Sequence, residues 1–142
     1  MLHSVQGLVI RRADGRQSMA ARGITARRAG WTDHWDTGDV WIAESGDRIV
    51  ATAREAVIGR RRIHVVGSVW VRDDLRGIKL GQRLMREIIA ASTAGILWLD
   101  CRPGLGPYYS EVGFLEDDRT KVMPDFIDGT DPPDQLVMSL CR

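Results

Sequence analysis

One amphipathic helical segment between two β-type runs constrains the fold more than any other feature of the sequence. Apolar residues recur at Leu80, Leu84 and Ile88, a spacing that gives a helix one buried stripe. Residues 63–71 before it are rich in β-branched side chains, and residues 95–101 after it are apolar on both alternations, as in a strand covered on both faces. A helix between two such strands is a crossover that joins parallel strands. Its first turn then lies at the carboxyl edge of the sheet, where ligands of α/β proteins usually bind.

Further short elements are predicted around this unit. Gly46-Asp47 predicts a hairpin between two β-type runs, residues 59–62 predict the next turn, and Gly67 indicates a bulge. Residues 14–30 predict two short helices that are broken at Gly23. The other expected elements are strands at 7–13, 40–45, 48–57, 114–117 and 135–140, and a short helix that ends at Gly113.

Length and composition predict one globular domain over residues 1–142. Hydrophobic residues make up 44% of the chain, and the net charge of +1 gives no global argument for a nucleic-acid or membrane partner. The N-terminus lacks a signal-peptide pattern and no apolar run approaches the ~20 residues that span a bilayer, so we expect a soluble cytoplasmic protein. Cys101 and Cys141 are expected to be small buried hydrophobes, and no metal site is expected.

The turn before the central helix, "DDLRGIKLG", has the composition of a phosphate site. A helix's first turn has unpaired N–H groups and a partial positive charge, to which Arg76 and Lys79 would add. Gly77 and Gly81 would let a ligand approach the backbone. The nucleotide P-loop pattern does not fit, because no Gly-Lys-Ser/Thr follows, and the glycines are wrongly spaced for the dinucleotide pattern. A plain strand-to-helix turn with a glycine for its shape is the alternative.

Two motifs resemble the GNAT superfamily of N-acetyltransferases. "VRDDLRGIKLGQRLM" is similar to the family's acetyl-CoA signature, in which Arg/Gln-x-x-Gly-x-Gly/Ala opens a helix, and the signature maps to residues 76–81. "PYYSEVGF" is similar to the family's Phe-Tyr-x-x-x-Gly-Phe, with Tyr109 at its tyrosine and Gly113-Phe114 at its end. "WIAESGDRIVATA" also resembles the family's second hairpin. The resemblance covers residues 40–116 well and the N-terminal third by element order alone.

The resemblance implies an α/β GNAT fold: a mixed central sheet of about six to seven strands, helices on both faces, and splayed parallel central strands. It implies acetyl-CoA as co-substrate, with its pantetheine arm along the main chain of Val69, Trp70 and Val71. The first glycine of the motif is replaced by Lys79, which we expect inside the helical first turn, where a non-glycine residue is sterically allowed. The residues implied around the pyrophosphate are Arg76, Gly77, Ile78, Lys79, Leu80, Gly81 and Gln82.

In GNAT enzymes an amine attacks the thioester directly, and a backbone N–H of the fourth strand can stabilise the oxyanion. The family pattern places Tyr109 to protonate the leaving thiolate, with Tyr108 as its core partner; the alternative for Tyr109 is a packed aromatic. The expected fourth strand contains no acid. His64 and Glu55 are therefore the candidate bases. The alternative for His64 is a hydrogen-bonded core residue, and the alternative for Glu55 is a charge that faces solvent. A chain of water molecules, or an amine that is already neutral, would need neither residue. A covalent acetyl intermediate on Cys101 is the less favoured route.

The acceptor is predicted from charge. Residues 116–134 carry seven acids against only Arg119 and Lys121, and their prolines and glycine predict a loop. A solvated surface loop is the alternative, but the resemblance puts this loop beside the acceptor, so we expect a cationic amine such as a polyamine, an aminoglycoside-like amine or a basic peptide end. The rival function is a non-catalytic acetyl-CoA-binding regulator that docks a partner protein. We expect no nucleic-acid partner despite the three arginines at 60–62, and a homodimer is left open.

Overall fold

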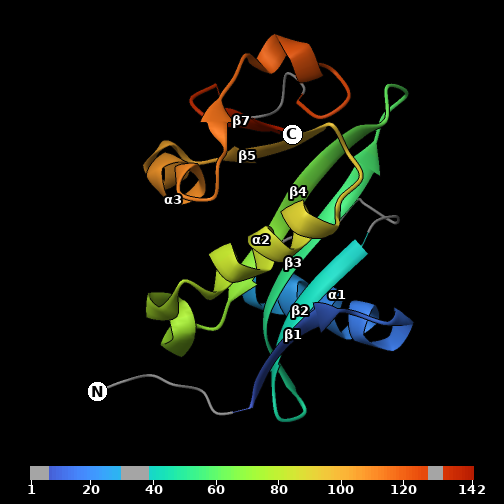
Figure 1. Ribbon diagram of the computed structural model, residues 1–142, viewed down its shortest axis with the longest axis vertical. Coiled ribbons are helices and arrows are strands. Elements are labelled where there is room, and N and C mark those ends of the chain that lie inside the picture. The colour runs from blue at the N-terminus through green and yellow to red at the C-terminus, as the bar shows by residue number, and fades with distance from the viewer. Residues whose placement is uncertain (1–6, 30–38, 128–132) are drawn as a thin grey trace.

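The structure is a computed structural model that describes residues 7–29, 39–127 and 133–142 (Figure 1). The described residues form one sheet of seven strands in the order β1-β2-β3-β4-β5-β7-β6. In chain order the elements are β1 (Leu8–Arg12), α1 (Gly15–Ala29), β2 (Asp39–Ser45), β3 (Arg48–Ile58), β4 (Ile63–Val71), the 3-10 segment η1 (Asp73–Ile78), α2 (Leu80–Ala91), β5 (Ile96–Cys101), η2 (Pro103–Leu105), α3 (Gly106–Ser110), β6 (Leu115–Glu116), η3 (Arg119–Val122) and β7 (Leu136–Cys141).

The sheet is mixed, and its pairing confirms the predicted fold class. Strands β1 to β4 form an antiparallel meander, α2 crosses over to β5, and β4 and β5 are parallel. Strand β7 then pairs antiparallel with both β5 and β6. Figure 1 shows α2 in front of the sheet and α1 behind it, so helices cover both faces.

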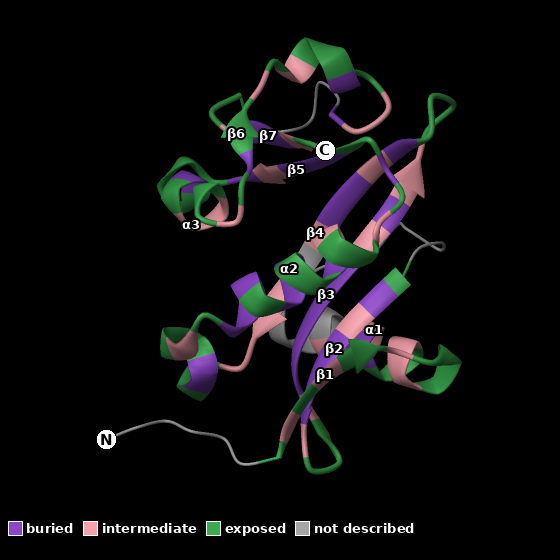
Figure 2. Cartoon of the chain, viewed as in Figure 1, coloured by how far each residue is buried: buried purple, intermediate pink, exposed green. Residues whose placement is uncertain are grey.

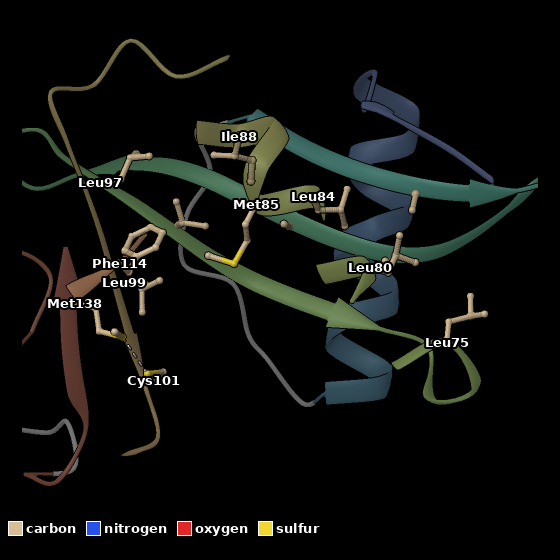
Figure 3. Close-up of a cluster of buried hydrophobic side chains, with 14 of the residues drawn as sticks. Leu75, Leu80, Leu84, Met85, Ile88, Leu97, Leu99, Cys101, Phe114 and Met138 are labelled. Carbon is tan, nitrogen blue, oxygen red and sulfur yellow. Dashed lines mark hydrogen bonds between the residues drawn. The ribbon is translucent and has the colours of Figure 1, made fainter. Parts of the chain in front are cut away.

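The largest hydrophobic core lies between α2 and the sheet. The stripe predicted for this helix is buried, because Leu80, Leu84 and Ile88 are each at most 1% exposed. Figure 3 shows these side chains and Met85 directed at the strands, with Phe114 close to β5 and β7. This core fixes α2, and with it the turn at its N-terminus, against the sheet.

Two smaller clusters lie on the face of the sheet away from α2. One joins α1 to β2 through Ala21, Val40 and Ile42. In the other, the segment after β6 covers β4, β5 and β7. Figure 2 shows the buried residues concentrated in the strands, with exposed residues in the turns and on the outer sides of the helices. The buried members of the second cluster are Ile63, Val65, Trp98, Val122, Ile127 and Val137.

The prediction of two short helices in residues 14–30 is wrong. A single helix, α1, runs from Gly15 to Ala29 and passes through Gly23 without a break. A glycine inside a helix costs only about 1 kcal/mol relative to alanine, and the burial of Ala21 against β2 favours the continuous helix. The hairpin at Gly46, with φ 64°, and the turn at residues 59–62 are confirmed. Within the described ranges, no helix is both long and apolar enough to cross a membrane.

Candidate active site

The central parallel strands part on their carboxyl side. Across the described chain, β4 and β5 pair at a single position, Val65 with Trp98, and the rest of β4 runs on without β5 beside it. Figure 1 shows β5 and β4 running in diverging directions. On its other edge β4 stays paired with β3, but Thr52 faces Trp70 while Arg54 faces Gly67, so β4 contains one extra residue there. This confirms the predicted bulge, and a bulge leaves a backbone N–H outside the regular ladder.

The turn from β4 into α2 leaves the first turn of this helix without a side-chain cap from any residue that the structure describes. The buried side chains of Leu75 and Leu80 anchor the turn to the core. At these two positions, therefore, only the backbone can contact a ligand. Arg76 is exposed; it pairs with Asp73 at 2.9 Å and also donates to the Val71 carbonyl at 3.3 Å. The N–H groups at the start of α2 and the exposed basic side chains therefore remain a suitable site for an anion.

Lys79 does not lie inside the helical turn, and that expectation is wrong. It is the N-terminal cap residue of α2 and adopts the left-handed conformation, with φ 57° and ψ 35°. A residue with a Cβ is strained there by about 1–2 kcal/mol. This position is the one at which the family signature has glycine, which adopts the left-handed region freely.

Helix α3 contacts the first turn of α2. A Cβ on Gly81 would lie inside 3.0 Å of the Tyr108 hydroxyl, so this hydroxyl covers the Gly81 backbone. Gln82 is 1% exposed; its Nε2 donates to the Tyr108 carbonyl at 2.8 Å and to Glu111 Oε2 at 2.9 Å. Lys79 Nζ lies 3.3 Å from the same Glu111 oxygen. Gln82 thus ties α2 to α3, a role that the sequence motif does not indicate.

Tyr109 packs against the main core, whereas Tyr108 faces α2, so the expectation that Tyr108 is the core partner is wrong. The two rings form an edge-on pair with centroids 5.1 Å apart. Burial raises the pKa of Tyr109 strongly, and Tyr108, Cys101 and Asp100 add to this increase. The hydroxyl therefore lies near the carboxyl end of β5 and stays protonated at neutral pH. A protonated phenol can donate a proton but cannot act as a base.

The two candidate bases contact each other. His64 Nδ1 lies 2.8 Å from Glu55 Oε2, and the Ser92 hydroxyl donates to the same oxygen at 2.9 Å. Ser92 is the C-cap of α2, so this cluster lies at the opposite end of that helix from the phosphate-type turn. His64 lies seven positions before Val71, about 23 Å away along the strand.

Several acids of the predicted acceptor loop have local partners. Asp125 pairs with Arg61 at 2.8 Å, and Asp117 pairs with Lys121 at 2.7 Å. Asp118 caps η3 by accepting the Thr120 N–H at 2.9 Å. Asp125 joins the segment to the turn between β3 and β4, and Asp117 accepts a hydrogen bond from the Ser139 hydroxyl of β7 at 2.6 Å, whereas the Asp118 contact lies within the segment. Asp128 and Asp131 lie outside the described residues.

Cys101 is a free thiol at the end of β5 and is 4% exposed, as expected, whereas the free Cys141 is exposed and its predicted burial is wrong. Burial, and to a lesser extent Asp100, raises its pKa. Both effects oppose formation of the thiolate that a covalent acetyl intermediate would need.

A family model described as an acetyltransferase (GNAT) domain matches residues 36–116, more than half of the chain. The protein belongs to the GNAT acetyltransferase family. Its fold is that of solved GNAT structures at low identity. Escherichia coli ElaA superposes with a TM-score of 0.71 at 17% identity, covering 94% of this chain and 99% of that one. A search of curated proteins finds no match.

Two further solved structures have the same fold; one is a named N-acetyltransferase and the other holds a bisubstrate analogue. The ribosomal-protein-S18-alanine N-acetyltransferase from Escherichia coli has a TM-score of 0.67 at 18% identity and covers 94% of this GNAT chain and 93% of its own. Arabidopsis thaliana Naa50, in complex with the bisubstrate analogue CoA-Ac-MVNAL, has a TM-score of 0.68 at 14% identity and covers 95% and 99%.

The motifs indicate no role at this turn for Glu111 or for the Tyr108 hydroxyl. The family pattern places Tyr108 at its first Phe, as a core residue, and leaves Glu111 unmarked. Their i, i+3 spacing predicts a shared side on a helix, but the sequence does not show that this side faces α2. Only the packing of α3 against α2 brings them to the turn.

Proposed function

We propose that the protein is an acetyl-CoA-dependent N-acetyltransferase that transfers the acetyl group to a primary amine by direct attack on the thioester. The observation that carries this proposal is the parting of β4 from β5 beyond Val65 and Trp98, beside the bulge in β4. The unpaired edge of β4 offers main-chain groups to an extended arm, and the uncapped N-terminus of α2 suits the pyrophosphate. Val69, Trp70 and Val71 would contact the arm, and residues 76–82 the pyrophosphate.

In the proposed reaction, a backbone N–H at the β4 bulge stabilises the developing oxyanion. Tyr109 protonates the leaving thiolate, a role supported by its position near the end of β5 and by a phenol that stays protonated at neutral pH, although its raised pKa also makes it a weaker acid. The roles of Glu55 and His64 as bases stay predictions. Glu55 and His64 contact each other and Ser92, at the end of α2 that lies away from the phosphate-type turn. We therefore propose that the amine enters the site in its neutral form or loses its proton to water.

A thiol-release assay tests this function. Purified protein with acetyl-CoA should release free CoA thiol when a suitable amine is present, and a screen should cover polyamines, amino acids, aminoglycosides and lysine peptides. Gly81→Glu should abolish binding of CoA, because it adds bulk and negative charge where the pyrophosphate would lie. CoA affinity in this variant equal to that of the wild type would remove the α2 turn from the proposal.

A non-catalytic acetyl-CoA-binding regulator is the second candidate. It is favoured by the absence of an acid from the sequence of β4 and by the engagement of Glu55 and His64 with each other. The same assay separates the two functions. CoA binding in calorimetry without thiol release from any amine supports the regulator.

The proposed acceptor is a cationic amine. The surplus of acids in residues 116–134 supports it, although Asp117, Asp118 and Asp125 have structural partners. A cationic acceptor predicts that its KM rises with salt, because screening weakens the attraction. A neutral or acidic acceptor found in the screen would make this segment a structural one only.

A further inference from the structure

The N-terminus of α2 has an internal anion beside it. Glu111 follows α3, and its carboxylate accepts a hydrogen bond from Gln82 Nε2 at 2.9 Å and lies 3.3 Å from Lys79 Nζ. Gln82 lies in the first turn of α2, and Lys79 is the N-cap residue of this helix. A carboxylate is stabilised at this end of a helix in the same way as a phosphate. The hydrogen bonds from Gln82 and Lys79 accordingly lower the pKa of Glu111.

Tyr108 lies at the same turn. Its hydroxyl covers the Gly81 backbone, one helical turn before Glu111 on the same side of α3. Burial raises the pKa of Tyr108, and the backbone N–H of Gln82 acts in the opposite direction, which places that N–H close to the phenolic oxygen. The Tyr108 hydroxyl therefore lies against the backbone of the first turn of α2, and Glu111 Oε2 lies against the side chains of Lys79 and Gln82.

The contact between α2 and α3 is not fully satisfied. Gln82 Oε1 is buried and has no hydrogen-bond partner among the described residues. A buried unpaired carbonyl oxygen is costly. Lys79 adds the strain of its left-handed conformation. Both costs lower the net stability of this contact.

We propose that Glu111 is an internal competitor of the cofactor pyrophosphate, which must displace the Glu111 carboxylate from Lys79 and from the first turn of α2. The inference rests on the proposed function. The exchange sets the affinity for CoA. It also couples CoA binding to the position of α3, which carries Tyr109. Cofactor binding would thus reposition the proton donor before the amine reacts.

Calorimetric titration of free CoA at low salt tests the competition. Glu111→Gln keeps the size of the side chain and removes its charge, and it should tighten CoA binding by about five- to tenfold, the range expected for one charge repulsion near a protein surface. Glu87→Gln removes an exposed carboxylate from the middle of α2 and is the matched control, with affinity within about twofold of the wild type. Unchanged or weaker binding in Glu111→Gln would overturn the proposal.

Two further titrations locate the effect. The gain from Glu111→Gln should persist with 3′-dephospho-CoA, which keeps the pyrophosphate, and should shrink in a Lys79→Met background, which lacks the contested ammonium. A gain that disappears with 3′-dephospho-CoA, or one of equal size in both backgrounds, would contradict the competition. If the wild type and every variant fail to bind CoA, the proposed function fails. If they bind with equal affinity, only this inference fails.

Discussion

Lys79 has a strained backbone conformation and also makes a side-chain contact. Its left-handed conformation at the start of α2 costs about 1–2 kcal/mol, and its ammonium contacts Glu111. Lys79→Gly should raise the free energy of unfolding by about 0.5–1 kcal/mol, because glycine relieves the strain but adds disorder to the unfolded chain. The midpoint of thermal unfolding should rise by about 2–4 °C. Lys79→Ala, which loses the charge and keeps the strain, should show no such increase. Equal stability of the two variants would contradict a strained cap.

Tyr109 is the residue on which the proposed chemistry depends. Tyr109→Phe keeps the packing of the ring against the core and removes only the proton donor. Turnover should fall by roughly ten- to a thousand-fold, in line with general-acid effects, while calorimetry should give unchanged CoA affinity. Turnover equal to that of the wild type would show that the hydroxyl has no part in the reaction.

The contact between α2 and α3 depends on the absence of a side chain at Gly81. A Cβ there meets the Tyr108 hydroxyl, so Gly81→Ala should lower the free energy of unfolding by about 1–2 kcal/mol despite the better helix propensity of alanine. In a Tyr108→Phe background the obstructing oxygen is gone, and the same substitution should cost less than half as much. Denaturant unfolding of the four proteins measures this coupling. Additive effects would place the hydroxyl away from Gly81.

The attachment of η3 to β7 should depend on pH. The Lys121 ammonium, the Ser139 hydroxyl and the Asp118 N–H all bond to Asp117 and lower its pKa to about 2 from an ordinary 3.8. A carboxyl whose pKa is lower in the folded protein stabilises it above the ordinary value, and this contribution is lost as the pH falls from about 4 toward 2. Asp117→Asn should therefore destabilise at pH 7 by on the order of 1 kcal/mol, and this effect should become steadily smaller as the pH falls to 2.

Thermal unfolding at several pH values measures the effect of Asp117→Asn. Asp134→Asn, at an exposed carboxylate in the same region, is the control and should leave the profile unchanged. A constant difference between Asp117→Asn and the wild type down to pH 2 would contradict the assignment.

At the scale of the whole molecule, one arginine joins the far end of the β3–β4 hairpin to the segment that covers the second core cluster. Arg61 donates to Asp125 and to the carbonyls of Lys121 and Met123, at 2.8 to 2.9 Å. Arg61→Met should lower the free energy of unfolding by about 1 kcal/mol, whereas Arg60→Met, at an exposed neighbour, should not. Asp125→Asn should likewise act on stability. A change in the acceptor KM without a change in stability would instead support a role for Asp125 in acceptor binding.

Local patterns in the sequence determined the main elements of this protein. The stripe of α2, the β-branched run of β4 and the doubly covered run of β5 predict a crossover, because side-chain periodicity reports which face of an element is buried. The turn before α2 is also a local feature, since uncapped N–H groups belong to any helix start. The extent of α1 could not be predicted, because packing outweighed the small cost of Gly23.

Only the tertiary structure decided which side chains meet at the site. Lys79 and Glu111 are 32 residues apart, and Arg61 and Asp125 are 64 apart. Such pairs leave no periodic pattern in the sequence. The sequence therefore could not show whether the acids of the loop bind an acceptor or form structural ion pairs. The face that α3 presents to α2, with Tyr108 rather than Tyr109 over Gly81, follows from how the two helices pack. The left-handed conformation of Lys79 follows from the path of the chain between η1 and α2, which the residue type alone would disfavour.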